Sequence, residues 1–238
     1  MSATKSICAC RVTKFFCSGD DMEPLLITLK TAAAATLITF FAGIFLARFV
    51  CNLKRGKTLV DAVIMLPLVL PPTVAGFFLL VTLGKRSPIG KLLLQFDITL
   101  VFTWQAAVIA AAVISLPLMY RTTRAAFEQL DPNIIYAART LGASERKIFW
   151  RIVLPNARAG ILAGTVLSFT RAAGEFGATI MFAGNVPGVT QTMSTAIYAA
   201  VQANNYDLAC KWAIMLATLS LTFIFALNTA VRKSGRHG

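Results

Sequence analysis

Charged side chains are scarce in this sequence. They make up 14% of its 238 residues, whereas roughly a quarter of the residues in a soluble domain are charged. Hydrophobic residues make up 57%, and the mean hydropathy is +0.70. A net charge of +13 would suggest nucleic-acid binding in a soluble protein. Here the basic residues lie mainly between and just outside apolar segments, which predicts a membrane protein with no nucleic-acid partner.

Residues that catalysis or metal binding would need are also scarce. The single histidine, His237, is close to the C-terminus. The five cysteines, at positions 8, 10, 17, 51 and 210, form no zinc-binding pattern and no convincing disulfide pattern. The first three could bind a metal, but an incidental cluster is the better interpretation. The sequence has no HExxH or G-x-S-x-G motif, so we expect no catalytic residues and no metal ligands.

The chain lacks a phosphate-binding loop as well. Gly56-Lys57-Thr58 resembles the end of such a loop, but the motif needs a glycine five residues before Gly56, where this chain has Cys51. We therefore expect no ATP site and no cofactor on this chain. Any ATPase that drives it would be another subunit.

Five apolar segments are each long enough to cross a bilayer, which takes roughly twenty residues. We expect an all-α membrane protein in which residues 24–232 form one transmembrane domain, between a poorly ordered tail (1–23) and a basic tail (233–238). The expected spans are 25–50, 59–83, 99–119, 160–182 and 208–231. Pro117 would mark the end of the third span. Residues 194–202, between the last two spans, could form a short helix at the membrane interface.

Lysine and arginine residues are distributed unevenly between the two sides of these spans. Segments 52–58 and 120–159 and the C-terminal tail hold 13 of them, whereas the opposite side holds six. Positive residues are enriched on the cytoplasmic side of membrane proteins. We therefore expect the C-terminus in the cytoplasm and the N-terminus outside, although loop 84–98, with three basic residues on the outer side, opposes this pattern locally.

Three prolines interrupt the second expected span. Pro67, Pro71 and Pro72 each lack an amide hydrogen and disrupt the hydrogen-bond ladder of a helix. Such a break is tolerated within a membrane where it is buried in protein or lines a wet cavity. We interpret the segment as a kinked helix that lines a pathway. A kink that serves only packing is the alternative.

Glu175 is the one carboxylate deep in the second half of the membrane region. Ionisable groups at such positions are costly and are usually paired or functional. Arg171, four residues earlier on the same helix face, is the expected partner. Gly174 and Gly177 would allow a neighbouring helix to approach closely. A polar gate that lines the pathway and a structural ion pair that locks the bundle remain equally open.

A polar, basic segment, residues 131–155, separates the third and fourth spans. Asp131 can cap a first helix, and Gly142 can end it in the left-handed conformation. Ser144 can then cap a second helix, which Pro155 would stop. Two short helices joined at a glycine would be exposed to a partner in the water phase.

This segment resembles the cytoplasmic EAA loop of binding-protein-dependent ABC importer permeases, which places a short coupling helix in a groove of the ATPase subunit. The resemblance rests on A-A-R-T-L-G-A followed by Phe149 and Leu-Pro, and its residues are Ala137, Ala138, Leu141, Gly142, Ala143, Phe149, Leu154 and Pro155. The acidic residue of the family would fall at Ile135 or Tyr136. Neither is acidic, so the polar contact which that acid makes with the ATPase is not expected here.

Other segments resemble molybdate permeases of the ABC importer family. They are L-P-L-V-L-P-P-T-V-A-G (66–76), I-A-A-A-V-I-S-L-P-L-M (109–119), G-E-F-G-A-T (174–179) and N-V-P-G-V-T-Q-T with A-I-Y after it (185–198). The resemblance extends from about residue 22 to residue 231. Sulfate and thiosulfate permeases look similar at G-E-F-G-A. The double proline and the N-x-P-G-x-T-x-T loop favour molybdate, with tungstate inseparable from it.

The resemblance implies the type I importer fold, with a homodimer in the bacterial inner membrane and a translocation path at the dimer interface. It also implies two cytoplasmic ATPase subunits, which would hold ATP and Mg, and an external molybdate-binding protein. A stand-alone channel or secondary transporter would need its own coupling-ion site. A membrane-embedded enzyme would need a nucleophile–base pair. The expected spans contain neither feature.

Overall fold

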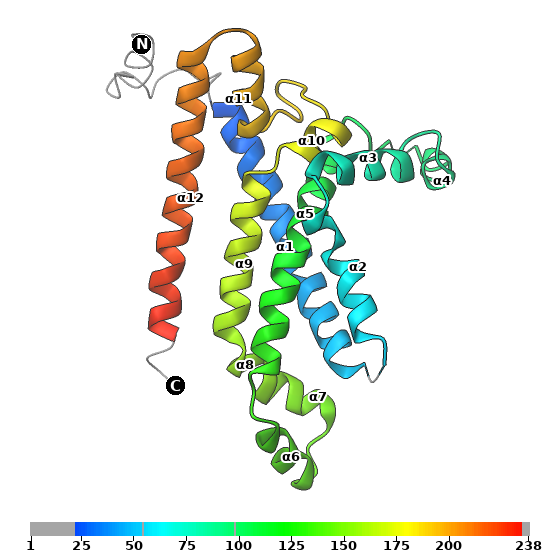
Figure 1. Cartoon of the computed structure of the whole chain (residues 1–238), viewed down its shortest axis with the longest axis vertical. Helices are drawn as coiled ribbons and strands as arrows, with labels where there is room; N and C mark the ends of the chain where they lie inside the picture. Colours follow the sequence, from blue (N-terminus) through cyan, green and yellow to red (C-terminus); the bar gives the residue numbers. More distant parts are fainter. Residues whose placement is uncertain (1–21, 54, 98, 235–238) are drawn as a thin grey trace.

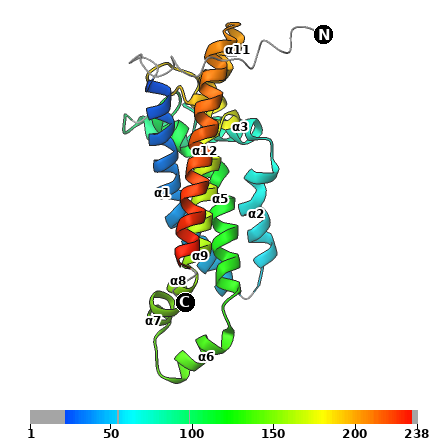
Figure 2. The ribbon, with the colours of Figure 1, turned by 90° about the vertical axis from the view of Figure 1, so that its left-hand side faces the viewer.

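The structure, a computed structural model, describes residues 22–53, 55–97 and 99–234, and these residues form helices and no strands (Figure 1). Its long helices are α1 (Glu23–Asn52), α5 (Trp104–Glu128), α9 (Arg158–Ala173) and α12 (Tyr206–Ser234). The first three pack side by side as the core of a bundle, and α12 lies outside it, beside α9 (Figures 1 and 2).

Small and hydroxyl-bearing side chains allow the three core helices to approach closely. A Cβ atom at Gly43 of α1 would lie 2.6 Å from Met119 Cγ of α5, so only glycine fits there. The hydroxyls of Thr39 and Ser168 lie 2.9 Å apart and link α1 to α9. Close packing and hydrogen bonds of this kind hold helices together where no water is present to drive them together. The buried alanines between these helices include Ala32, Ala35, Ala111, Ala172 and Ala173.

The second expected span is two helices rather than one kinked helix. α2 (Lys57–Val69) and α3 (Pro72–Leu83) meet at an angle of 109°, so α3 lies across the bundle (Figure 1). The break falls at Leu70 and Pro71, whereas α2 continues through Pro67. The prediction of a disrupted helix is therefore confirmed, but the disruption is a sharp turn at the double proline.

Two other helices differ from the expected spans. The helix that replaces the third expected span, α5, continues through the buried Pro117 to Glu128. The fourth expected span is broken, because α9 ends at Ala173 and a separate short helix, α10 (Gly177–Phe182), follows after three residues.

The remaining helices lie in the connections. They are α4 (Pro88–Leu94), α6 (Pro132–Thr140), α7 (Glu145–Ile148), the π-helical turn η3 (Phe149–Val153), α8 (Leu154–Asn156) and α11 (Met193–Gln202). α11 contains the short helix that was expected at 194–202. Residues 1–21 of the expected N-terminal tail, with its three cysteines, lie outside the described residues. At the other end, α12 extends to Ser234, into the expected basic tail.

Three of the described helices are long and apolar enough to cross a membrane by length and composition. They are α1, α5 and the part of α12 from Tyr206 to Phe225. Two bent pairs, α2 with α3 and residues 145–156 with α9, raise the number to five if each pair counts as one span. The protein is thus an all-helical membrane protein with three to five candidate spans.

Candidate functional site

The segment between α5 and α9 projects from one end of the bundle as a pair of short helices, α6 and α7 (Figures 1 and 2). Asp131 caps α6, since its Oδ1 accepts a hydrogen bond of 2.9 Å from the amide of Asn133. Ser144 caps α7 by accepting one of 3.4 Å from the amide of Lys147. Gly142 has φ +77°, a left-handed conformation that suits glycine. All three local predictions are confirmed.

An ion pair spans the turn at Gly142. Arg139, at the end of α6, donates to both carboxylate oxygens of Glu145, at the start of α7, over 2.6 and 3.2 Å. The Arg139 guanidinium holds the pKa of Glu145 below its ordinary value, and the carboxylate raises the pKa of Arg139. Both groups are in solvent, so their pair is screened and adds little stability. Its geometry instead links the two helices across the turn.

The second helix of the segment is anchored to the bundle by Phe149. This side chain is buried, and its ring meets the Phe127 ring edge-on with the two centroids 6.0 Å apart. The guanidinium carbon of Arg48 lies over the Phe149 ring, 3.8 Å from its centroid. Phe149 therefore contacts both α1 and α5. The helix also continues through Pro155, the expected stop, to Asn156, because the wider turn of η3 precedes the proline.

The other residues of the expected coupling loop divide into an exposed and a covered group. Leu141, at the tip, is 87% exposed, and Gly142, Ala137 and Pro155 are exposed with it. Ala138 is buried, whereas Ala143 and Leu154 are half-buried. Tyr136, where the family acid is missing, is 59% exposed, and the Arg139 guanidinium lies 5.8 Å from its ring. The tip at residues 136–142 is therefore exposed except at Ala138.

A second arrangement lies near the opposite end of the bundle, where the two helix breaks meet. The start of α3 packs against the start of α10 (Figure 1). A Cβ atom at Gly177 would lie 3.0 Å from both Pro72 Cβ and the backbone nitrogen of Thr73, so the close approach expected there is confirmed. Gly174 is exposed, and its Cβ would meet only Thr170 O at 3.6 Å, so the prediction of close packing at Gly174 was wrong.

Glu175 lies in the break between α9 and α10 and is 2% exposed. One carboxylate oxygen accepts a hydrogen bond of 2.6 Å from Arg171, and the other accepts one of 2.8 Å from the amide of Ala178. The expected ion pair is therefore present, and it joins the end of α9 to the first turn of α10. Because both oxygens are occupied within the chain, this geometry favours the structural lock over the gate.

A polar cluster between α2 and α5 was not expected. The Arg124 guanidinium donates to Asp61 and, over 2.7 Å, to Glu128, and the Tyr120 hydroxyl also donates to Asp61. Asp61 stands out in the sequence as an acid within an apolar run. Its partners come 59 and 63 residues later, however, and no local pattern connects residues so far apart. The cluster ties α2 to the end of α5 from which the α6–α7 pair projects.

The profile of the family described as "Binding-protein-dependent transport system inner membrane component" matches residues 39–233. The chain belongs to this family. It is therefore an inner-membrane component of a transport system, and the projecting α6–α7 pair and the two broken helices are features of that component.

Relatives of known role are similar over most of their length. The molybdenum transport system permease protein ModB of Escherichia coli (strain K12) is 45% identical over 207 residues, covering 84% of this chain and 90% of the relative. ModB of Haemophilus influenzae is 39% identical and covers 90% and 96%. The sulfate transport system permease protein CysT of Escherichia coli (strain K12) is 36% identical and covers 88% and 76%.

Solved structures of ABC transporters share the fold of this permease-family chain. A bacterial transporter involved in the import of alginate matches with a TM-score of 0.74 at 18% identity, covering 92% of this chain and 81% of that one. The MetNI methionine transporter, in inward-facing conformations, matches with a TM-score of 0.71 at 17% identity, covering 89% and 94%. At these identities the likeness establishes the fold alone.

Proposed function

We propose that this chain is the permease subunit of an ATP-driven molybdate importer. The exposed tip at residues 136–142, carried on two helices whose relative position is set by Gly142 and whose base is anchored by Phe149, is the observation that carries the proposal. A rigid element of this kind can pass the motion of a bound ATPase to the bundle. Similarity to ModB proteins from two bacteria supports molybdate as the cargo.

A sulfate permease is the second candidate. The similarity to CysT, at 36% identity, supports it less strongly than the similarity to ModB supports molybdate. Tungstate is a further candidate, since the sequence did not separate it from molybdate. An external binding protein would supply most of the selectivity in each case, and the permease would need only a weak path.

The assembly we propose has two copies of this chain, two ATPase subunits that hold ATP and Mg, and an external molybdate-binding protein. The path runs between the two copies, and this chain hydrolyses no ATP itself. Each copy has five spans with the N-terminus outside, which puts the α6–α7 pair and the C-terminus in the cytoplasm. The asymmetry of basic residues supports this orientation. ATP binding closes the ATPase pair and turns the bundle outward to receive the anion.

Reconstitution tests this function. The chain is placed in liposomes with its ATPase and binding protein, and ATP-driven molybdate uptake is measured with each component omitted in turn and with sulfate in large excess. We expect uptake only with all three components and nearly unchanged uptake in the presence of sulfate. Equal competition by sulfate would make the chain a sulfate permease, and uptake without the ATPase would contradict the proposed mechanism.

A further inference from the structure

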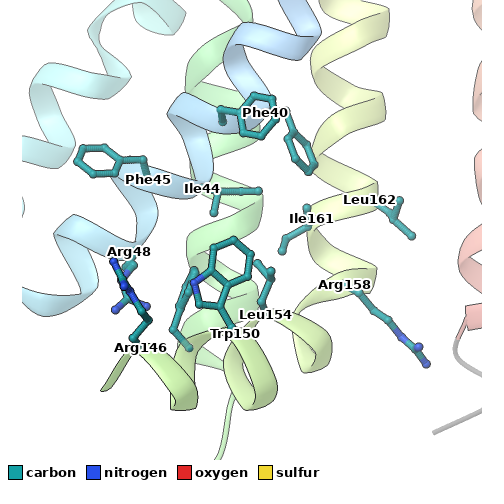
Figure 3. A pocket seen from close by; sticks show the side chains of 12 residues that line it. Phe40, Ile44, Phe45, Arg48, Arg146, Trp150, Leu154, Arg158, Ile161 and Leu162 are labelled. Atoms are coloured by element: carbon teal, nitrogen blue, oxygen red, sulfur yellow. The ribbon is translucent and has the colours of Figure 1, made fainter. Parts of the chain in front are cut away.

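An open groove runs along the bundle just above the α6–α7 pair, between α1, η3 and α9 (Figure 3). Its volume is about 710 Å³, within the roughly 300–1,000 Å³ that small-molecule sites occupy. Three of its large aromatic side chains are mostly exposed: Phe41 (65%), Phe45 (67%) and Trp150 (62%). Leu154, Ile161 and Leu162 also line the groove. Its walls are therefore apolar and uncovered.

Two arginines mark the end of the groove nearest the α6–α7 pair. Arg48, from α1, and Arg146, from α7, both line this end of the groove (Figure 3). Arg158 also lines the groove, but its side chain points away toward the outside (Figure 3). No acidic side chain is among the lining residues, and within the described chain no carboxylate forms a salt bridge with Arg48 or Arg146. Two guanidinium groups that line the same end of a groove suit an anion such as a phosphate.

The length of the groove matches one leaflet of a membrane. The part of α1 that lines it, from Phe40 to Arg48, is about 12 Å long at the helical rise of 1.5 Å per residue. One leaflet contains about 15 Å of hydrocarbon, which is half of a bilayer core. An acyl chain could thus lie along the aromatic wall while its headgroup reached the two arginines.

A second copy of the chain is a poorer occupant, because it would bring no free carboxylate to the arginines. The acids at this end of the bundle already have partners within the described chain: Asp61 and Glu128 bind Arg124, Asp131 caps α6, and Glu145 binds Arg139. An anionic phospholipid supplies both: its phosphate is a negative charge for the arginines, and its acyl chain is an apolar group for the aromatic wall.

From this charge and shape we propose that the groove binds one anionic phospholipid of the cytoplasmic leaflet, with its phosphate on Arg48 and Arg146 and an acyl chain against Phe41, Phe45 and Trp150. The lipid would bridge α1, the coupling segment (residues 131–155, which contain α6, α7 and η3) and α9. Basic pockets between helices on the cytoplasmic side suit anionic headgroups. The inference concerns binding, so it does not depend on which anion is transported.

Trp150 provides a direct readout. The full chain is placed in phosphatidylcholine nanodiscs that contain a small fraction of brominated phosphatidylglycerol or brominated phosphatidylcholine. The fluorescence quenching that is lost in Trp150→Phe reports contact of that side chain with the brominated chain. We expect phosphatidylglycerol to quench Trp150 at a roughly tenfold lower fraction than phosphatidylcholine, because each arginine near the surface adds attraction.

Matched variants test the role of the arginines. Arg48→Gln with Arg146→Gln should abolish the preference for phosphatidylglycerol. Arg55→Gln with Arg121→Gln, two exposed arginines outside the groove, removes the same charge and should preserve it. Circular dichroism checks that each variant is folded. Equal quenching by the two lipids in the unaltered chain would overturn the proposal. A preference for phosphatidylglycerol that survives in the Arg48/Arg146 variant would also overturn it. So would a preference that is present in the single chain but disappears when two copies are assembled, because a second copy would then cover the groove.

Discussion

At the residue scale, the contact between the two helix breaks depends on the absence of a side chain at Gly177. Any Cβ there must displace Pro72 or the backbone of Thr73. We predict that Gly177→Val destabilises the protein by about 1–3 kcal/mol through overpacking and reduces molybdate uptake. Thermal unfolding of the detergent-solubilised protein and uptake in liposomes measure the two effects.

Gly174 provides the matched control, since it lies three residues away, is exposed, and its Cβ position makes only an ordinary contact, with Thr170 O at 3.6 Å. Gly174→Val should leave both the melting temperature and uptake nearly unchanged. If Gly174→Val lowers the melting temperature and uptake as much as Gly177→Val does, then close packing of α10 on α3 is not the reason for the glycine at position 177.

The sequence predicted residue roles well where the cause is local. The caps at Asp131 and Ser144 and the left-handed Gly142 follow from interactions within three residues, and they were found. The same holds for the pair between Arg171 and Glu175, one turn apart. The link from Asp61 to Tyr120 and Arg124 was missed, because it depends on how α2 packs against α5.

At the element scale, the ion pair between Arg139 and Glu145 links α6 to α7 across the turn at Gly142 and limits its local motion. The pKa of Glu145 is lowered in the folded chain, so the pair is complete above the ordinary carboxyl pKa and is lost as the pH falls through the lowered value. We predict that a spin label at Leu141→Cys, in a cysteine-free variant, keeps the same mobility from neutral pH down to about 4.3 and becomes more mobile only below it.

Glu145→Gln should raise the mobility of that label already at neutral pH, since the amide carries no charge to hold Arg139. Glu128→Gln is the control, because Glu128 pairs with Arg124 in α5 and not with the α6–α7 pair. A label that moves equally in both variants would show that the ion pair does not order the turn.

Helix breaks show where sequence patterns fail at this scale. Prolines indicated a disrupted second span, but the 109° turn also needs α10 as a surface for α3. Gly174 and Gly177 flank the break at Gly174–Phe176, but they were interpreted only as sites of close helix packing. Pro117 misled in the opposite direction. A buried proline is tolerated in α5 because neighbouring helices pack around it.

At the scale of the whole molecule, the orientation in the membrane can be tested with two exposed positions at opposite ends. Leu141 is at the tip of the α6–α7 pair, and Val189, 47% exposed, lies in the loop whose Gly188 is close to Glu23 at the start of α1. We predict that a membrane-impermeant maleimide labels Val189→Cys in intact cells, but labels Leu141→Cys only after permeabilisation. The reverse pattern would place the coupling segment outside.

The whole protein works as we propose only if the α6–α7 pair transmits the motion of the ATPase to the bundle. Gly142 and Gly56 form a matched pair for this test, since their φ angles are +77° and +79° and neither has an atom within 4 Å of its Cβ position. A β-branched side chain strains the left-handed backbone equally at both sites, but only Gly142 lies in the coupling segment.

The measurement is the amount of molybdate imported per ATP hydrolysed by the reconstituted transporter. We predict that Gly142→Val lowers this ratio severalfold while ATP hydrolysis continues, and that Gly56→Val leaves the ratio unchanged. An unchanged ratio in Gly142→Val, or an equal loss in both variants, would contradict coupling through this segment.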